Sequence, residues 1–168
     1  MHNLAYFAMK EFRDKYYFGG SVLEIGGAVG YGSVRSLFNG QYVTMDVSGD
    51  ADIIVADMYK WHEINSNHFD YVISTSTLEH IEYPWLTMEE CYRVLVPGGL
   101  VCHVAPSAGV EHKYPVDCYR YYPDGGRALL RWANFDVVNV YTHWTANCVD
   151  DGGNQFKDTV MIGQKNVK

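Results

Sequence analysis

The sequence contains no apolar run that approaches the roughly 20 residues needed to cross a bilayer. Its first ten residues also lack a basic stretch followed by an apolar block, which is the pattern of a secretory signal. We therefore expect neither a membrane partner nor export, and the expected location is the cytoplasm.

Cysteine is scarce and scattered. The chain has four cysteines, and no two of them have the Cys-x-x-Cys spacing that is typical of zinc sites and redox motifs. We expect reduced thiols rather than a disulfide framework, and we expect no bound metal.

Basic residues are also few. The chain has 13 Lys and Arg residues against 20 Asp and Glu residues, and its formal net charge is −7. An acidic surface without a basic cluster repels phosphate backbones, so nucleic acid is not an expected partner. The composition, 48% hydrophobic and 20% charged, fits a globular domain with a real core.

Two kinds of apolar segment alternate along the chain. Short apolar runs bounded by polar or glycine residues indicate buried strands, and segments with apolar residues at helical spacing indicate helices. The predicted strands are residues 22–25, 42–45, 53–55, 71–73, 100–104, 137–141 and 159–163. The predicted helices are residues 4–18, 33–38, 85–95 and 125–132, and a turn is predicted at 97–99. This alternation predicts an α/β fold with a mostly parallel sheet covered on both faces.

Polar side chains stand at or near the carboxyl ends of four predicted strands, namely Glu24, Asp46, Asp57 and Ser74. In open parallel sheets, ligands bind at this edge. Three carboxylates and a hydroxyl are therefore predicted to share one edge of the sheet. An alternative for Asp46 and Asp57 is that they cap turns or helices, which is a common use of aspartate.

A glycine-rich segment, residues 24–32, follows the first predicted strand. Glycines there permit positive φ angles and close approach of the backbone to a ligand, although an ordinary tight turn has the same composition. The segment lacks the dinucleotide fingerprint Gly-x-Gly-x-x-Gly, because reading from Gly26 puts Ala28 and Tyr31 at the second and third glycines. The carboxylate of Glu24 would repel a pyrophosphate but could hold an ammonium group.

These segments together resemble the class I S-adenosylmethionine-dependent methyltransferases, specifically the family of small methyltransferase domains. Residues 22–32 resemble its first motif, acid-x-Gly-x-Gly-x-Gly, with Ala28 in place of the middle glycine. The other matching segments are Asp46, Asp57-Met58, residues 69–74, Leu78-Glu79-His80 and residues 93–99.

The resemblance implies a Rossmann-like three-layer sandwich with a seven-stranded, mostly parallel sheet whose last strand is antiparallel. We expect a single domain over residues 1–168, with a helix in 1–20, a cofactor-binding half in 21–107 and a substrate side in 108–168. The implied cofactor is S-adenosyl-L-methionine. The residues implied to bind it are Glu24, Gly26, Gly27, Ala28, Gly30, Asp46, Val47, Asp57, Met58 and Ser74.

The long polar and aromatic segment 106–124 is the predicted substrate region, because ordering such a loop is costly unless it is used. It resembles a pattern, His-x-Tyr-Pro-x-Asp-x-x-Arg, found in a subset of these methyltransferases that is loosely associated with glycans and secondary metabolites. We predict that His112 is a general base oriented by Asp117, with His80 as the alternative base.

Three tyrosines of the same segment, Tyr114, Tyr119 and Tyr122, are predicted to wall a pocket for a small hydroxylated acceptor, such as a sugar or secondary metabolite. The alternative is a packed loop without catalytic groups. In that loop Asp117 would pair with Arg120, and His112 would cap a turn.

Two rival functions stay open beside methyl transfer. One is a non-catalytic S-adenosylmethionine-binding or scaffold module, which the replacement of a motif glycine by Ala28 would favour. The other is a dinucleotide-dependent oxidoreductase on a related sheet, against which Glu24 and the interrupted glycine pattern argue.

Overall fold

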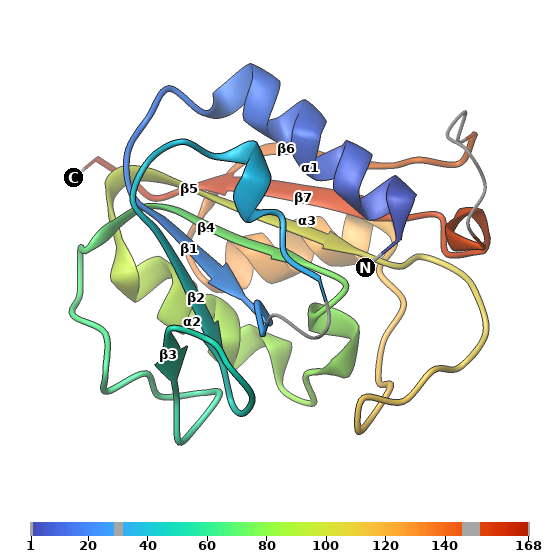
Figure 1. The fold of residues 1–168 in the computed structure, drawn as a ribbon. Coiled ribbons are helices and arrows are strands. Elements are labelled where there is room, and N and C mark those ends of the chain that lie inside the picture. Colours follow the sequence, from blue (N-terminus) through green and yellow to red (C-terminus); the bar gives the residue numbers. More distant parts are fainter. Residues whose placement is uncertain (1, 29–31, 146–151, 168) are drawn as a thin grey trace.

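The computed structural model describes residues 2–28, 32–145 and 152–167. They form one seven-stranded sheet in the order β3-β2-β1-β4-β5-β7-β6 (Figure 1). Neighbouring strands from β3 to β5 are parallel, whereas β7 is antiparallel to both β5 and β6. The predicted sheet with an antiparallel last strand is therefore confirmed. The strands are β1 (Val22–Ile25), β2 (Tyr42–Asp46), β3 (Ile53–Ile54), β4 (Phe69–Thr75), β5 (Leu95–Ala105), β6 (Asp136–Thr142) and β7 (Thr159–Gln164).

Helices cover both faces of the sheet, which gives the predicted three layers (Figure 1). One face carries α1 (Asn3–Tyr16) and a short 3₁₀ turn, η2 (Arg35–Leu37), and the other carries α2 (Pro84–Val94) and α3 (Pro123–Trp132). None of these helices, nor any other in the described part of the chain, is long and apolar enough to cross a membrane.

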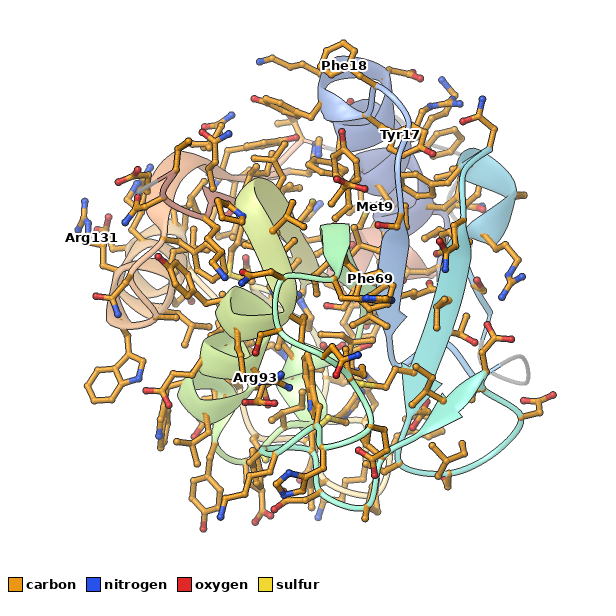
Figure 2. All side chains as sticks on the ribbon, turned by 90° about the vertical axis from the view of Figure 1, so that its left-hand side faces the viewer. Met9, Tyr17, Phe18, Phe69, Arg93 and Arg131 are labelled. Carbon is orange, nitrogen blue, oxygen red and sulfur yellow. The ribbon has the colours of Figure 1, made fainter. Side chains whose placement is uncertain are left out.

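Each face of the sheet has its own buried core, and α1 shows why the sequence predicts it. Its buried residues recur at helical spacing and face the sheet, and Met9 among them is completely buried. Figure 2 shows Met9 directed towards the interior, whereas Phe18, beyond the end of the helix, points outward and is 88% exposed.

Two predicted elements differ in the structure. The helix predicted at 33–38 is only the single turn η2, because the backbone becomes extended at Phe38, before the Asn39-Gly40 pair. The turn predicted at 97–99 lies within β5 as a bulge, where Gly98 has a φ of +82° and the pairing with β4 shifts register.

The register brings the strand ends together. Ile25, at the end of β1, pairs with Met45 of β2 on one side and with Ser74 of β4 on the other. The carboxyl ends of these three strands therefore lie at one edge, next to the loop 106–122 that leaves β5.

Candidate active site at the strand carboxyl ends

A tight turn ends β1 and begins the site. Gly26 has a φ of +74°, and a Cβ at this position would collide with the Thr77 side chain. A Cβ on Gly27 would come within 3.0 Å of the Thr44 and Glu24 side chains. Both glycines are therefore required by packing, and the turn places the ends of β1 and β4 in contact. The predicted binding residue Gly30 lies outside the described residues.

Ala28 packs towards the segment that follows β2. Its side chain is buried, and a Cβ on Gly49 would lie only 3.1 Å from the Ala28 methyl group. The missing side chain of Gly49 thus leaves room for the methyl group where the family motif has glycine. The Ala28 N–H donates to Oδ2 of Asp46 at 3.4 Å, which connects the glycine turn to the end of β2.

Glu24 is buried and braces the turn from inside. Its Oε2 accepts a hydrogen bond from the Ser33 hydroxyl, and its Oε1 accepts one from the Val34 N–H at 3.2 Å. Burial raises the pKa of this carboxyl. The structure therefore shows Glu24 holding the far end of the glycine-rich segment, with both oxygens engaged.

The other predicted cofactor residues fall into two groups. Asp46 and Val47 stand at the end of β2, where the Val47 N–H donates to Oδ1 of Asp46 at 2.7 Å and Val47 is 49% exposed. Asp57 stabilises a turn by accepting from the Tyr59 N–H at 2.8 Å. Met58 is half-buried beside the core.

Ser74 lies inside β4 rather than on the open edge. Its side chain is completely buried, and its hydroxyl is 2.7 Å from Nδ1 of His103 on β5. Burial lowers the pKa of His103 to about 3, so this ring is neutral and supplies a partner to the hydroxyl.

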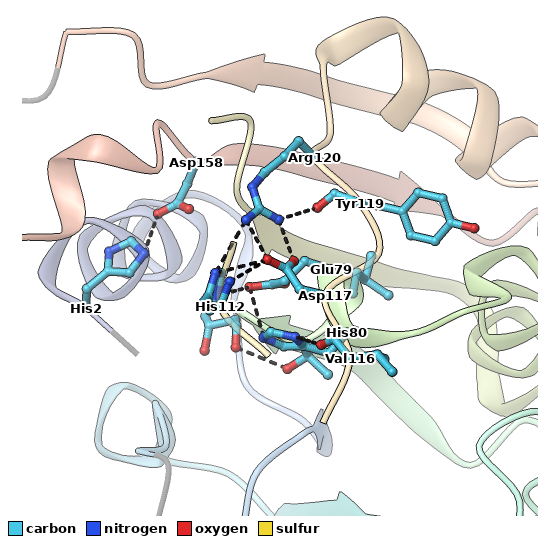
Figure 3. Close-up of polar contacts among 12 residues, drawn as sticks. His2, Glu79, His80, His112, Val116, Asp117, Tyr119, Arg120 and Asp158 are labelled. Carbon is cyan, nitrogen blue, oxygen red and sulfur yellow. Dashed lines mark hydrogen bonds and ion pairs between the residues drawn. The ribbon is translucent and has the colours of Figure 1, made fainter. Parts of the chain in front are cut away.

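A second group of polar side chains gathers beyond the end of β4 (Figure 3). The loop 106–122 brings His112 to His80, and the two ring centroids are 5.0 Å apart. Nε2 of His80 lies 3.7 Å from Oε1 of Glu79, and Nε2 of His112 lies 3.8 Å from the same oxygen. The structure therefore brings both predicted bases together around one carboxylate.

Asp117 holds this loop in place. Its Oδ2 accepts a hydrogen bond from the backbone N–H of His112 at 2.7 Å and lies 3.5 Å from Nδ1 of the same residue. Arg120 donates to both Asp117 oxygens, at 2.6 and 2.7 Å, and these bonds lower the pKa of Asp117 to about 2. The pairing of Asp117 with Arg120 is thus present together with the predicted contact between Asp117 and His112.

Two buried carboxylates in this region have no hydrogen-bond partner for either oxygen within the described part of the chain, and the sequence did not single out either as a separate site residue. They are Glu79 and Asp158, and burial raises their pKa values to about 8 and about 7. Nε2 of His2, at the start of the chain, lies 3.5 Å from Asp158 (Figure 3). The position of Glu79 between Leu78 and His80 at a strand end was an available signal, whereas the approach of His2 to Asp158 had none.

The three predicted tyrosines do not form one wall. Tyr114 stands beside the histidines, with its ring centroid 5.8 Å from that of His80. Tyr119 and Tyr122 instead line a hollow of about 610 Å³ between α2 and α3, together with Trp85 and Trp132. The hollow is mostly apolar in its lining, whereas the histidine cluster is polar.

The arrangement thus separates two kinds of chemistry along one edge. The ends of β1 and β2 offer backbone groups and the Asp46 carboxylate, which suit a polar ligand that carries hydroxyl and amino groups. The end of β4 offers two imidazoles around a buried carboxylate, which suit proton transfer. Thr77, packed against Gly26, joins the two parts.

Comparisons with known proteins identify a similar domain and fold. Residues 24–103 match the family model described as a methyltransferase domain. A chain in the complex of the Haloferax volcanii Trm112 methyltransferase activator with a candidate methyltransferase is 19% identical, with a TM-score of 0.73, and the match covers 96% of this chain and 90% of that chain. No curated protein matches the sequence.

Two further solved structures have the same fold. A SAM-dependent methyltransferase from Methanosarcina mazei is 14% identical, with a TM-score of 0.73, and the match covers 94% of this chain and 98% of that chain. The 1,6-didemethyltoxoflavin-N1-methyltransferase of Burkholderia thailandensis, solved with that substrate and S-adenosylhomocysteine, is 15% identical, with a TM-score of 0.72 and coverages of 96% and 78%. These findings confirm the predicted fold, and the family-model match over residues 24–103 agrees with the predicted resemblance to methyltransferase domains.

Proposed function

We propose that the protein transfers a methyl group from S-adenosylmethionine to a small hydroxylated acceptor, because residues 24–103 match the methyltransferase-domain model and the chain has the fold of solved methyltransferases. One observation carries the acceptor side of the proposal. His80 and His112 converge on the buried Glu79 carboxylate next to the glycine turn, so a proton-accepting group stands beside the cofactor edge.

The residues at the ends of β1 and β2 fit this cofactor. The Gly26-Gly27 backbone would lie against the amino-acid part, and Asp46 would accept hydrogen bonds from the ribose hydroxyls. Asp46 is only half-buried, so its oxygens retain acceptor capacity beyond the bonds from Ala28 and Val47. Asp57 and Met58 would flank the adenine. We propose that Glu24 stabilises this turn rather than binding the cofactor, because both its oxygens already accept hydrogen bonds from Ser33 and Val34.

When bound, the cofactor supplies an electrophilic methyl group, and the protein has to align the acceptor and exclude water. A hydroxyl acceptor must also lose its proton, for which a positioned base contributes roughly 10²–10⁴-fold. His112 is the proposed base, because its Nε2 is partly exposed while Asp117 and the Val110 carbonyl lie within reach of its Nδ1. His80, which burial makes a weaker base by lowering its pKa, is the second candidate.

We infer a small acceptor rather than a macromolecule, because the Tyr114 ring lies edge-on beside both histidines and occupies space next to them. The second candidate function is a cofactor-binding module without turnover. Interruption of the glycine motif at Ala28 favours it, although the space beside Gly49 accommodates the methyl group.

Release of S-adenosylhomocysteine with a panel of sugars, phenols and amines tests the proposal. We expect turnover with hydroxylated acceptors and a loss of roughly 10²–10⁴-fold in kcat for His112→Ala. His68 is exposed and directly precedes β4, at the opposite end of that strand from the histidine cluster. The matched control His68→Ala should therefore keep normal turnover. Cofactor binding without turnover on any acceptor would favour the module, and an unchanged rate in His112→Ala would remove this base.

A further inference from the structure

Three potential metal-ligand atoms converge at the end of β4, although the sequence predicted no metal. They are Oε1 of Glu79 and the Nε2 atoms of His80 and His112, and all lie within 4.8 Å of one another (Figure 3). Ligand atoms about 2.0–2.1 Å from a tetrahedral zinc ion lie about 3.4 Å apart. The two carboxylate-to-imidazole distances are 3.7 and 3.8 Å, a few tenths of an ångström longer than this value, and the two imidazole nitrogens, which lie within 4.8 Å of each other, have further to approach.

The outer nitrogens of both rings already have acceptors. Nδ1 of His80 is 2.7 Å from the Val116 carbonyl oxygen. Nδ1 of His112 is 3.3 Å from the Val110 carbonyl oxygen and 3.5 Å from Oδ2 of Asp117, and the Arg120 guanidinium, a donor, lies 3.4 Å from the same nitrogen. A ring that donates from Nδ1 in its neutral form carries a lone pair on Nε2. Histidines that bind metals are oriented in this way by a carbonyl or carboxylate.

The consequence is that three lone-pair-bearing atoms face one another. The Glu79 side chain is 1% exposed, and among residues 2–28, 32–145 and 152–167 neither of its oxygens has a hydrogen-bond partner. Burying a carboxylate without a hydrogen-bond partner costs free energy of folding. Such groups in native proteins usually take up a proton or bind an ion or a ligand. The Arg120 guanidinium, the nearest opposing cation, is already paired with Asp117 through two hydrogen bonds.

We propose that Glu79, His80 and His112 bind a divalent transition-metal ion, with zinc as the best match. Two imidazoles and one carboxylate form a ligand set that suits Zn²⁺ and related ions and leaves a coordination position open. The His112 side chain is 26% exposed and that of His80 is 13% exposed, so solvent reaches the two imidazole ligands while Glu79 is buried.

This inference deepens the proposed function and rests on it for its catalytic meaning. A hydroxyl that occupies the open position of such a site loses its proton more easily, because coordination lowers its pKa. In the metal-loaded protein, His112 would be a ligand, and the proton of the coordinated hydroxyl would pass to solvent water rather than to His112. The substrate class is unchanged: a small acceptor with a hydroxyl group.

Metal binding can be measured without cofactor or acceptor, so its outcome is independent of methyl transfer. The probes are Zn²⁺ in calorimetry and Co²⁺ in visible absorption, on untagged full-length protein stripped with a chelator. All proteins carry Cys118→Ser, because Cys118 is an exposed free thiol that could bind either ion. We expect one ion per chain and the absorption bands of a site with four or five ligands.

Glu79→Gln and His112→Asn should each weaken binding at least about 10-fold, whereas the exposed-site control His68→Asn should not. His112→Asn keeps the test valid if the buried Glu79→Gln variant fails to fold, since circular dichroism reports folding separately. The proposal is overturned if the parent protein binds no ion at millimolar concentration, or if His112→Asn binds it as tightly as the parent does.

Discussion

Buried or half-buried carboxylates occur on both parts of the sheet edge, and they differ in their surroundings. At the ends of β1 and β2, Glu24 and Asp46 accept hydrogen bonds from nearby backbone and hydroxyl groups. Beyond β4 and before β7, Glu79 and Asp158 have no hydrogen-bond partner for any of their oxygens. The first pair stabilises a turn through these hydrogen bonds. The second pair contributes little to the free energy of unfolding unless it takes up a proton or binds an ion.

The glycine turn that joins the two regions should show the largest effect on stability. Gly26→Ala forces a Cβ into the left-handed region and against Thr77, so we expect a loss of about 2–5 kcal/mol in the free energy of unfolding. Gly19→Ala is the matched control, because Gly19 also has a positive φ but has nothing within 4 Å of its added Cβ. Urea unfolding of both variants should differ clearly, and equal losses would contradict the contact with Thr77.

One substitution in each region tests whether the two buried glutamates differ in their contribution to the free energy of unfolding. Glu24→Gln should lower the free energy of unfolding by about 1–3 kcal/mol, because it disturbs the bonds to Ser33 and Val34. Glu79→Gln should leave the stability of the metal-free protein unchanged or raise it, because no hydrogen bond is lost. Urea unfolding in the presence of a chelator measures both, and a larger loss in Glu79→Gln would reverse the comparison.

The sequence predicts contacts between residues that are close in the chain better than contacts between distant residues. The strand β1, the glycine turn and Asp46 follow from local patterns and from the family resemblance, since each motif is contiguous. Ser74 was predicted on the open edge because it ends an apolar run. The strand in fact continues to Thr75, and the hydroxyl is taken by His103 across the sheet.

The second region was predicted only in part. His112, Asp117 and Arg120 are close in sequence, so their grouping was foreseeable. The loop folds back onto Glu79 and His80, which precede His112 by more than 30 residues. This contact depends on backbone hydrogen bonds such as the one from the Cys118 N–H to the backbone carbonyl oxygen of Glu79. Such a contact between distant segments leaves no local pattern in the sequence.

His103 represents a third case, a buried ring that already has a partner. Burial lowers its pKa to about 3 from about 6.5 in the unfolded chain, so the unfolded chain takes up a proton first as the pH falls. The free energy of unfolding should therefore decrease by about 1 kcal/mol between pH 6 and pH 5 through this group. His103→Asn should flatten that slope in urea unfolding measured at both pH values, and an unchanged slope would show that another group is responsible.

The smallest effect concerns the pair of hydrogen bonds from Arg120 to Asp117, which holds the loop of the second region. Arg120→Lys loses the paired contact with the buried Asp117, and we expect a decrease of about 0.5–1 kcal/mol in the free energy of unfolding. Arg131→Lys is the control, because Arg131 is exposed in the last turn of α3, and it should cause no measurable change. Thermal unfolding resolves the pair, and equal shifts would mean that Arg120 does not hold the loop.

The central claim is that the two regions have separate tasks, with cofactor binding at β1 and β2 and acceptor chemistry beyond β4. Calorimetric titration with S-adenosylhomocysteine, in the presence of a chelator, tests it most directly. We predict that Asp46→Ala weakens binding by about 1–3 kcal/mol, or roughly 5–150-fold in Kd, whereas His112→Ala keeps the parent Kd within about twofold. An unchanged Kd in Asp46→Ala, or an equal loss in both variants, would contradict the account.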